Sequence, residues 1–524
     1  MATILWASFA RGGADSAADI VARLTGASTW RVVGFTFGQA ALSTLVTLAL
    51  GLPGAYVFAR FTFPGKSLLA ALTTVPFVLP NIVVAAAFTA VIGPKSPLTA
   101  LLAWGLGRDP ATPLDLRYTL GAILLAHIFY NYTLVIRLVG GFWANLHPHL
   151  EQAARTLGAS PLRAFFTVTL PLLRPAISAA ALLIFIFCFT SFGIVLVLGG
   201  PRFATLEVAI YRETVNYANL PVAASLSLVQ IACTLSLTLL YTRLQSGLAQ
   251  PLDLRPQWNT QRRPQRAGEI AVIAANVVVG GLLLGMPLLL LVARSFDAGW
   301  RYYVALFENP RHSIFYVPPL AAVCNSLRFA LAATGIALIL GLLTALALYR
   351  RKQGWLLDAL FMLPLGTSAV TLGLGYLLSM NRPVDLRGTP VLIICAHTLV
   401  ALPFVVRSLL PALQAIRPSL REAAATLGAS PGRVFVEVDL PIIWRALIVG
   451  GIFAFTVSLG EFGATAMIAR PDMPTLPIAI YRFLGKPGAL NYGQAMAMST
   501  LLMAVCVAGF TLAEWLRPPG TQAF

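Results

Sequence analysis

The fold of this 524-residue chain is decided by a stretch that occurs twice, LEQAARTLGASPLRAFFTVTLP at residues 150–171 and LREAAATLGASPGRVFVEVDLP at residues 420–441. The two copies align without a gap at an offset of 270 residues, and fourteen of the 22 residues are identical, as Gly158 and Gly428 are. Self-similarity at a fixed spacing indicates a repeated structural unit. The chain therefore consists of two similar halves.

The same spacing relates other parts of the chain. The matching pairs are Ala126-His127 with Ala396-His397, Arg137 with Arg407, Phe192-Gly193 with Phe462-Gly463, and residues 205–212 with residues 475–482. We expect a first half at residues 1–243 and a second half at residues 269–524. Residues 244–268, which are rich in Arg and Pro, are expected to form a cytoplasmic linker.

The composition indicates an all-α integral membrane protein. Hydrophobic residues make up 58% of the chain, charged residues only 11%, and the mean hydropathy is +0.80, so a soluble interior could not bury all of the apolar surface. Long apolar runs recur, each near the roughly 20 residues that cross a bilayer as a helix, and the alternating pattern of a barrel strand is missing. We therefore expect a helical bundle in lipid.

Eleven apolar runs are long enough to span a membrane. They lie at residues 32–59, 68–93, 118–140, 173–198, 221–243, 269–294, 323–349, 355–380, 390–412, 443–468 and 490–515. Basic residues gather on alternate connections, which sets one orientation by the positive-inside rule. The segments expected to be external are 94–117, 199–220, 295–321 and 469–489.

Two parallel repeats of six spans would need a twelfth helix. Residues 3–9 read like residues 289–296 at the end of the first span of the second half, and a polar segment follows both. We expect residues 1–9 to be the tail of a truncated first helix. A repeat of six spans, an even number, places both halves in the same orientation about an axis along the membrane normal, with the solute path between them.

Several function classes are excluded by the same residues. The net charge of +18 would suit nucleic acid, but the basic side chains sit in short connections between apolar runs. The five cysteines are isolated in apolar stretches, so no metal site is expected. Gly65-Lys66-Ser67 is a fragment of a phosphate-binding loop, but Arg60 stands where its first glycine belongs. With no acid–base or nucleophile constellation either, the chain is not expected to be an enzyme.

The repeated stretch has its own folding logic. A short helix is stopped at Gly158, which can adopt the left-handed conformation. Ser160-Pro161 then starts a second helix, because Ser caps free N–H groups and Pro suits the first helical position. Gly428 and Ser430-Pro431 repeat this arrangement in the second half. We call these two helix–glycine–helix units, residues 150–171 and 420–441, the first and second knob.

Both knobs resemble the cytoplasmic E-A-A…G…L-P loop of binding-protein-dependent ABC importer permeases. The residues that carry the resemblance are Glu422, Ala423, Ala424, Gly428, Ser430 and Pro431, and in the first half Glu151, Gln152, Ala153, Ala154, Gly158, Ser160 and Pro161. Gln152 departs from the pattern, since the family has Glu there, so the two contacts are expected to be unequal.

The resemblance implies a multi-pass permease of the bacterial inner membrane, with each knob inserted into one of two copies of a separate ATPase subunit. ATP and Mg²⁺ would be bound by that partner, and no cofactor by this chain. A solute-binding protein outside the membrane would deliver the solute. The halves would then rock between outward-open and inward-open states as ATP is bound and hydrolysed.

A few polar side chains lie inside the predicted spans, where ionisable groups are costly and usually serve a cavity or a partner. Glu461 could line the solute path or accept hydrogen bonds from a neighbouring element, and its counterpart Ser191 carries no charge. His127 and His397 recur in both halves, which favours a structural hydrogen bond. Further candidates for the path are the polar residues Asn81, Tyr130 and Asn131.

The transported solute is only indicated by resemblance. Residues 125–131, 187–192 and 198–211 look most like the thiamine permeases, and iron(III) permeases of the same fused architecture are the alternative. An ion-coupled secondary transporter is a rival from another class, since such carriers are also built from repeats. It would have no reason to repeat a cytoplasmic docking loop.

Overall fold

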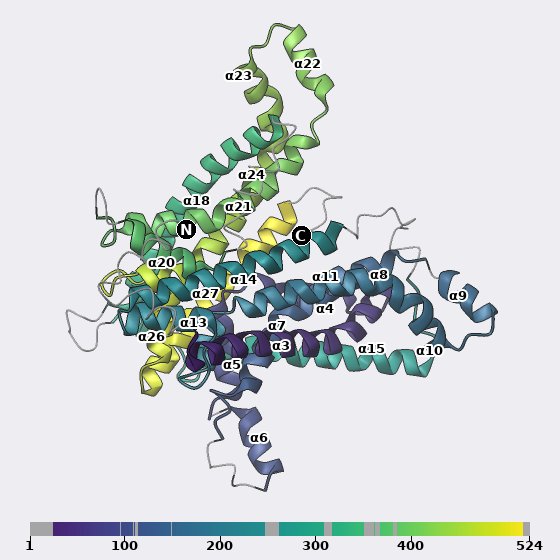
Figure 1. Cartoon of the computed structure of the whole chain (residues 1–524), viewed down its shortest axis with the longest axis horizontal. Coiled ribbons are helices and arrows are strands. Elements are labelled where there is room, and N and C mark those ends of the chain that lie inside the picture. Colours follow the sequence, from purple (N-terminus) through teal and green to yellow (C-terminus); the bar gives the residue numbers. More distant parts are fainter. Residues whose placement is uncertain are drawn as a thin grey trace.

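A computed structural model gives the architecture of the chain (Figure 1). It describes residues 25–94, 96–107, 109, 114–147, 149–246, 261–308, 317–350, 361, 367–380 and 385–516. Within these ranges the structure is helical and contains no strand, only an isolated bridge between Phe61 and Arg262. The all-α prediction is confirmed.

Ten helices among the described residues are long and apolar enough to cross a membrane. They are Ala27–Arg60, Asn81–Gly105, Leu120–Asn145, Pro161–Phe189, Leu220–Leu244, Ala267–Ser295, Pro319–Tyr349, Pro390–Gln414, Pro431–Gly460 and Ala489–Leu516. Of the span expected at residues 355–380, the structure describes Phe361 and residues 367–380, which contain α20 (Ala369–Ser379). The expected helix tail at residues 1–9 also lies outside them.

Three predicted spans are broken rather than continuous. The span at 68–93 divides into α4 (Lys66–Val78) and α5 (Asn81–Ile92), because Pro80 lacks an N–H and forces Leu79 into an extended conformation. The other two divide near the ends remote from the knobs, giving α11 (Leu170–Phe189) with α12 (Gly193–Leu198), and α24 (Leu440–Leu459) with α25 (Gly463–Ile468). Periodicity alone gave no sign of these breaks.

The expected external segments also contain helices. Residues 94–117 hold α6 (Pro97–Gly105), and residues 295–321 hold α17 (Arg301–Val304). Residues 199–220 hold α13 (Leu206–Tyr211), and residues 469–489 hold α26 (Leu476–Leu484). α13 and α26 begin in the same way, since Thr36 and Ser326 accept hydrogen bonds from the backbone N–H of Leu206 and Leu476 at 3.0 and 2.6 Å.

The two halves pack in the same manner. In the first half, α3 (Ala27–Arg60) contacts α7 (Leu120–Leu134), η1 (Val135–Gly140) and α11. In the second half, α18 (Pro319–Arg350) contacts α21 (Pro390–Gln414) and α24. Glycines allow the closest approach in both: a Cβ on Gly51 would lie 2.7 Å from Val135, and a Cβ on Gly341 would lie 2.5 Å from Val405.

The halves interlock through the first span of the second half. That span consists of α15 (Ala267–Gly280), η6 (Gly281–Gly285) and α16 (Met286–Ser295), and it packs against α3, α4 and α5 of the first half. α27 (Ala489–Leu516) contacts α5 as well as α16, α24 and α26. Each half therefore completes its packing with helices of the other.

The halves meet at one end and diverge at the other. Figure 1 shows α5, α13, α20 and α26 gathered at the left, and contacts join α13 to α20 and α26 to α5. The first knob, with α9 (His149–Thr156) and α10 (Pro161–Ala164), lies at the far right, while the second, with α22 (Pro418–Thr426) and α23 (Pro431–Val434), lies at the top. The knob-bearing ends are thus far apart.

We expect Gly341→Val to destabilise the second half, because the added side chain would overlap Val405 in a close-packed interface. Overpacking of this kind costs about 1–3 kcal/mol. The matched control is Gly335→Val in the same helix, where an added Cβ meets nothing within 4 Å. Thermal unfolding in detergent should give a lower Tm for the first variant than for the control, and equal Tm values would contradict the packing described here.

Candidate functional site: coupling loops and solute path

Each knob adopts the local conformation that its sequence predicts. Gly158 and Gly428 are left-handed, with φ of +89° and +84°. Ser160 and Ser430 then cap α10 and α23, accepting hydrogen bonds from the N–H three residues on at 3.3 and 3.4 Å. The glycines reverse the chain, and the caps restart it as a helix that leads back to the membrane.

The knobs project into solvent. In α9 and α22 no residue is buried, and Leu157 and Leu427, which precede the two glycines, are 89% and 88% exposed. Gln152, Ala153, Glu422 and Ala423 are exposed, whereas Glu151, Ala154 and Ala424 are half-buried. Both knobs therefore present the same surface, with a leucine at the tip. Docking of an ATPase subunit on this surface stays a prediction.

The two knobs are attached to the bundle differently. In the second, Arg421 donates to Asp439 at 2.7 Å and to the hydroxyl of Tyr349, and its guanidinium lies 4.6 Å from the centre of that ring. Partial burial alone would lower the pKa of Arg421, but its hydrogen bonds to Asp439 and Tyr349 outweigh burial and raise it. The charged pair thus joins the two arms of the second knob just before α24 begins, and Tyr349 joins α22 to α18.

The first knob cannot form the same pair, because Glu151 and Thr169 stand at the equivalent positions. Glu151 instead interacts electrostatically with Arg60 at the end of α3 and with Arg262 in the segment before α15. That segment is bound to α3 by backbone hydrogen bonds, from Arg262 to Arg60 and from Thr62 to Arg262, both of 3.0 Å. The first knob therefore faces the connection between the halves.

Glu461 has a structural explanation. Its carboxylate accepts hydrogen bonds from the backbone N–H groups of Ala464 and Thr465 at 2.8 and 2.9 Å, and from the Thr465 hydroxyl. It therefore caps α25 at the break after α24. Glu461 is buried, and its oxygens point to these donors and to His397, whose Nε2 lies 3.6 Å away. Two roles were expected for Glu461, lining the solute path or accepting hydrogen bonds from a neighbouring element. In this conformation it accepts hydrogen bonds.

The repeated histidines join helices, as predicted. His127 hydrogen-bonds Ser43 of α3 at 2.9 Å and Ser191 in the break after α11 at 2.8 Å. His397 hydrogen-bonds Ser458 of α24 at 2.8 Å and Thr465 of α25 at 2.9 Å. Both are buried. Each ring therefore fixes the break at the end of its half that is remote from the knob.

The other predicted path residues separate into two groups. Asn131 is buried within the first half, where its amide donates to the His127 carbonyl at 2.9 Å, and Tyr130 donates to the Leu79 carbonyl at 2.7 Å. The Asn131 amide also donates to the Cys188 sulfur of α11 at 3.4 Å, and Leu79 lies at the break between α4 and α5. Both side chains thus join α7 to a neighbouring segment, so neither faces an open path in this conformation. Asn81 is different, because it is exposed at the start of α5 and its Cβ lies near Gly193 of the first half.

An aromatic group at the boundary between the halves was not predicted. Phe192 and Phe462 stack with ring centres 5.4 Å apart and planes at 24°. Tyr211 packs on Phe192 at 5.4 Å, Tyr481 packs on Phe462 at 5.7 Å, and the two tyrosine side chains interact electrostatically. We call these four residues the aromatic quartet. The sequence shows that these residues recur at the same spacing in the two halves. It does not show that the four side chains meet.

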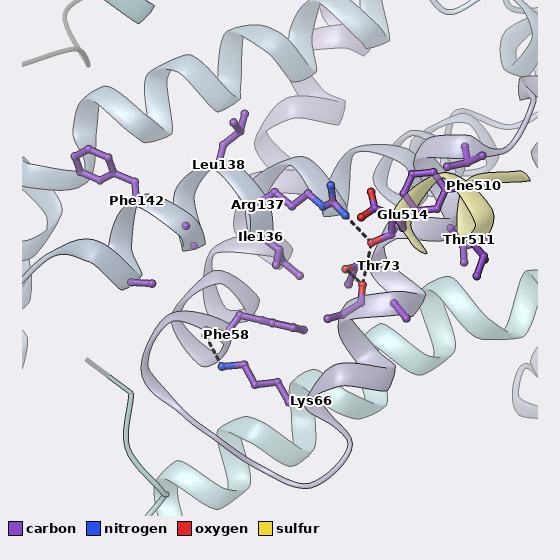
Figure 2. A pocket seen from close by; sticks show the side chains of 18 of the residues that line it. Phe58, Lys66, Thr73, Ile136, Arg137, Leu138, Phe142, Phe510, Thr511 and Glu514 are labelled. Carbon is purple, nitrogen blue, oxygen red and sulfur yellow. Dashed lines mark hydrogen bonds between the residues drawn. The ribbon is translucent and has the colours of Figure 1, made fainter. Parts of the chain in front are cut away.

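A cavity of about 1300 Å³ opens on the knob side of the bundle (Figure 2). α4, η1 and α8 (Gly141–Asn145) of the first half line it together with α27 of the second half. Its polar lining includes Arg137, which donates to Thr74 at 2.7 Å, and Glu514. The quartet and this cavity are therefore both shared between the halves.

Lys66 also lines this cavity (Figure 2). Its ammonium donates to the backbone carbonyls of Phe58 and Phe61 at 2.8 and 2.7 Å, so it caps the end of α3. The lysine of the rejected phosphate-loop fragment thus has a structural role. In the part of the chain that the structure describes, no group of three His, Cys, Asp or Glu side chains could hold a metal ion.

Comparison with known proteins gives the family. A family model described as "Binding-protein-dependent transport system inner membrane component" matches residues 51–250 and 337–518. The thiamine transport system permease protein ThiP of Salmonella typhimurium is 31% identical over 508 residues, which cover 94% of this chain and 90% of that protein. ThiP of Brucella abortus is 29% identical over 524 residues, covering 98% and 91%.

A probable ABC transporter permease protein, y4fN of Sinorhizobium fredii, is 27% identical over 507 residues, covering 94% of this chain and 87% of that protein. The family model thus matches both halves, and the relatives match nearly the whole chain. With its membrane-spanning helices and its two knobs, this chain belongs to the binding-protein-dependent inner membrane components, as a fused two-half permease of the ABC importer type.

Proposed function

We propose that this permease moves thiamine, or a closely related small solute, into the cytoplasm of a bacterium. The observation that carries the proposal is similarity to ThiP proteins over more than nine-tenths of the chain. An iron(III) permease of the same architecture remains the alternative. An ion-coupled secondary transporter is disfavoured, because two exposed knobs with the same leucine at the tip suit two copies of a docking partner.

The proposed partners follow from the knobs and from the family. One ATPase subunit would receive the first knob and a second copy the other, and these subunits would bind ATP and Mg²⁺. A solute-binding protein would dock at the opposite end, near α13 and α26. We further propose that residues 1–243 and 269–524 are the two halves and residues 244–268 the cytoplasmic linker.

The proposed mechanism is alternating access. The conformation described here suits the inward-open state, since the halves meet at the quartet and diverge towards the knobs. ATP would draw the two ATPase subunits together, and the knobs would move with them. The ends that bear the knobs would then approach, the ends at the quartet would part, and solute would enter from the binding protein. Hydrolysis would reset the halves.

The solute is tested by rebuilding the permease with its ATPase and binding protein in lipid vesicles. We expect ATP-dependent uptake of labelled thiamine and no comparable uptake of iron(III). Iron(III) uptake without thiamine uptake would retain the transporter class and change the solute. Uptake driven by an ion gradient without ATP would contradict the proposed mechanism.

The coupling role of the knobs is tested by Gly428→Val. A β-branched residue is strongly disfavoured at φ of +84°, so the turn should deform and the knob should lose its fit to the ATPase. We expect ATP-dependent uptake to fall at least tenfold. The matched control is Gly432→Val, because Leu162 already occupies the equivalent position of the first knob. Equal uptake by the two variants would contradict the coupling role.

The anchor of the second knob is tested by Arg421→Ala. The change leaves Asp439, which is largely buried, without its partner, and hydrogen bonds to charged groups contribute about 1.5–3 kcal/mol. We expect fewer solute molecules transported per ATP hydrolysed, because α22 would no longer be held to Asp439 at the end of the knob or to Tyr349 of α18. In the control, Arg433→Ala removes an exposed pair with Glu437 on the same knob, and such pairs contribute little. If the control variant transports equally few solute molecules per ATP, the proposed role of Arg421 is wrong.

A further inference from the structure

The aromatic quartet lies where a solute must cross from one side of the permease to the other. Phe192 and Tyr211 come from the first half, and Phe462 and Tyr481 stand at the matching positions of the second. Because the stacked phenylalanines are related by the repeat, the approximate two-fold axis passes between them. This axis is also the expected solute path between parallel repeats.

The quartet is held in place by close packing of both halves. A Cβ on Gly193 would lie 3.2 Å from the Phe462 ring and from Asn81, and a Cβ on Gly460 would lie 2.6 Å from Pro80. The breaks that carry Phe192 and Phe462 therefore fit against the start of α5 without spare room. Both phenylalanine rings are buried, at 3% and 4% exposure. In this conformation the quartet closes the outer end.

The charged and acidic side chains beside the quartet are bound by other groups of the protein. Glu461 directly precedes Phe462, and Glu207 is buried one turn before Tyr211, where Gln230 donates to it at 3.4 Å. Arg212 and Arg482 directly follow the two tyrosines, and each donates to a backbone carbonyl, at 2.7 and 3.1 Å. Burial also raises the pKa of Glu207 to about 8, so this carboxyl carries little charge near pH 7. The distinctive chemistry of the quartet is therefore its flat ring faces rather than an electrostatic sign.

We infer that the quartet is both the outer seal and the surface that recognises a flat aromatic solute by stacking. This inference deepens the proposed function and depends on it, because both rings of thiamine are planar and aromatic. When the halves part, the rings of Phe192 and Phe462 no longer stack on each other. A planar ring that enters between them replaces the lost contact, whereas a non-aromatic solute does not. The free-energy cost of separating the two phenylalanine rings would thus be lowest when the solute is aromatic.

The test replaces the ring faces with little loss of side-chain volume. In the double variant Phe192→Met and Phe462→Met, side chains of similar bulk retain the seal but present no ring. We expect ATP-dependent thiamine uptake, at saturating loaded binding protein, to fall about fivefold or more, since the variant removes aromatic stacking on both faces of the solute. The double variant Phe192→Tyr and Phe462→Tyr retains the faces and should remain within about twofold of wild type.

Two further measurements separate recognition from simple plugging. Without ATP, vesicles that contain either double variant should retain an entrapped small dye as well as wild type does. Phe88→Met, which alters an aromatic pair with Phe129 inside the first half, should leave uptake unchanged. ATPase activity stimulated by the binding protein should persist in all variants, which shows that the assembled complexes are folded.

The outcomes are distinct. Wild-type uptake by the Met variant, or an equal loss in the Tyr variant, would overturn recognition by ring faces. Dye leakage from vesicles with the Met variant would contradict the expectation that side-chain bulk alone keeps the outer end sealed. If the wild-type complex itself takes up no thiamine, the proposed function is wrong, and this result is distinct from any difference between the variants. Slow uptake in the Met variant together with near-normal uptake in the Tyr variant would support the inference.

Discussion

The constraint on which this structure depends is that backbone polar groups inside a bilayer must be satisfied by the protein itself. A continuous helix satisfies its backbone groups by its own hydrogen bonds, whereas the helix breaks at the end remote from the knobs need other partners. There, Glu461 accepts from two N–H groups of α25, and the histidines bind side chains at the breaks. Thr36 and Ser326 satisfy the first N–H groups of α13 and α26. These contacts allow non-helical backbone near the axis, and so they position the quartet.

Much of the architecture could be predicted, because it depends on local signals. Apolar run length identified the spans, and the fixed repeat identified two halves and both knobs, down to the left-handed Gly158 and Gly428. The breaks could not be predicted in the same way. Pro80 does signal one of them, but residues 190–192 and 460–462 contain no proline, and tertiary contacts stabilise those two.

The candidate site was less predictable, because it depends on which segments meet. Asn131 is polar and lies in a span, yet it joins α7 to Cys188 of α11 within the first half. Glu207 was assigned to an external segment but is buried beside Gln230. The rings of Phe192 and Phe462 come together only because the halves pack about an axis. The asymmetry of the knobs was expected from Gln152, whereas the structure adds a larger difference at Glu151 and Arg421.

The interlocked first span of the second half has a consequence for biosynthesis. α15 and α16 form part of the wall around α3, α4 and α5, so the first half acquires its complete surface only after the ribosome has translated past residue 295. Until then, lipid must occupy the place of these helices. Fusion in one chain supplies them at a one-to-one ratio and at high local concentration, which favours correct pairing over association with a half from another molecule.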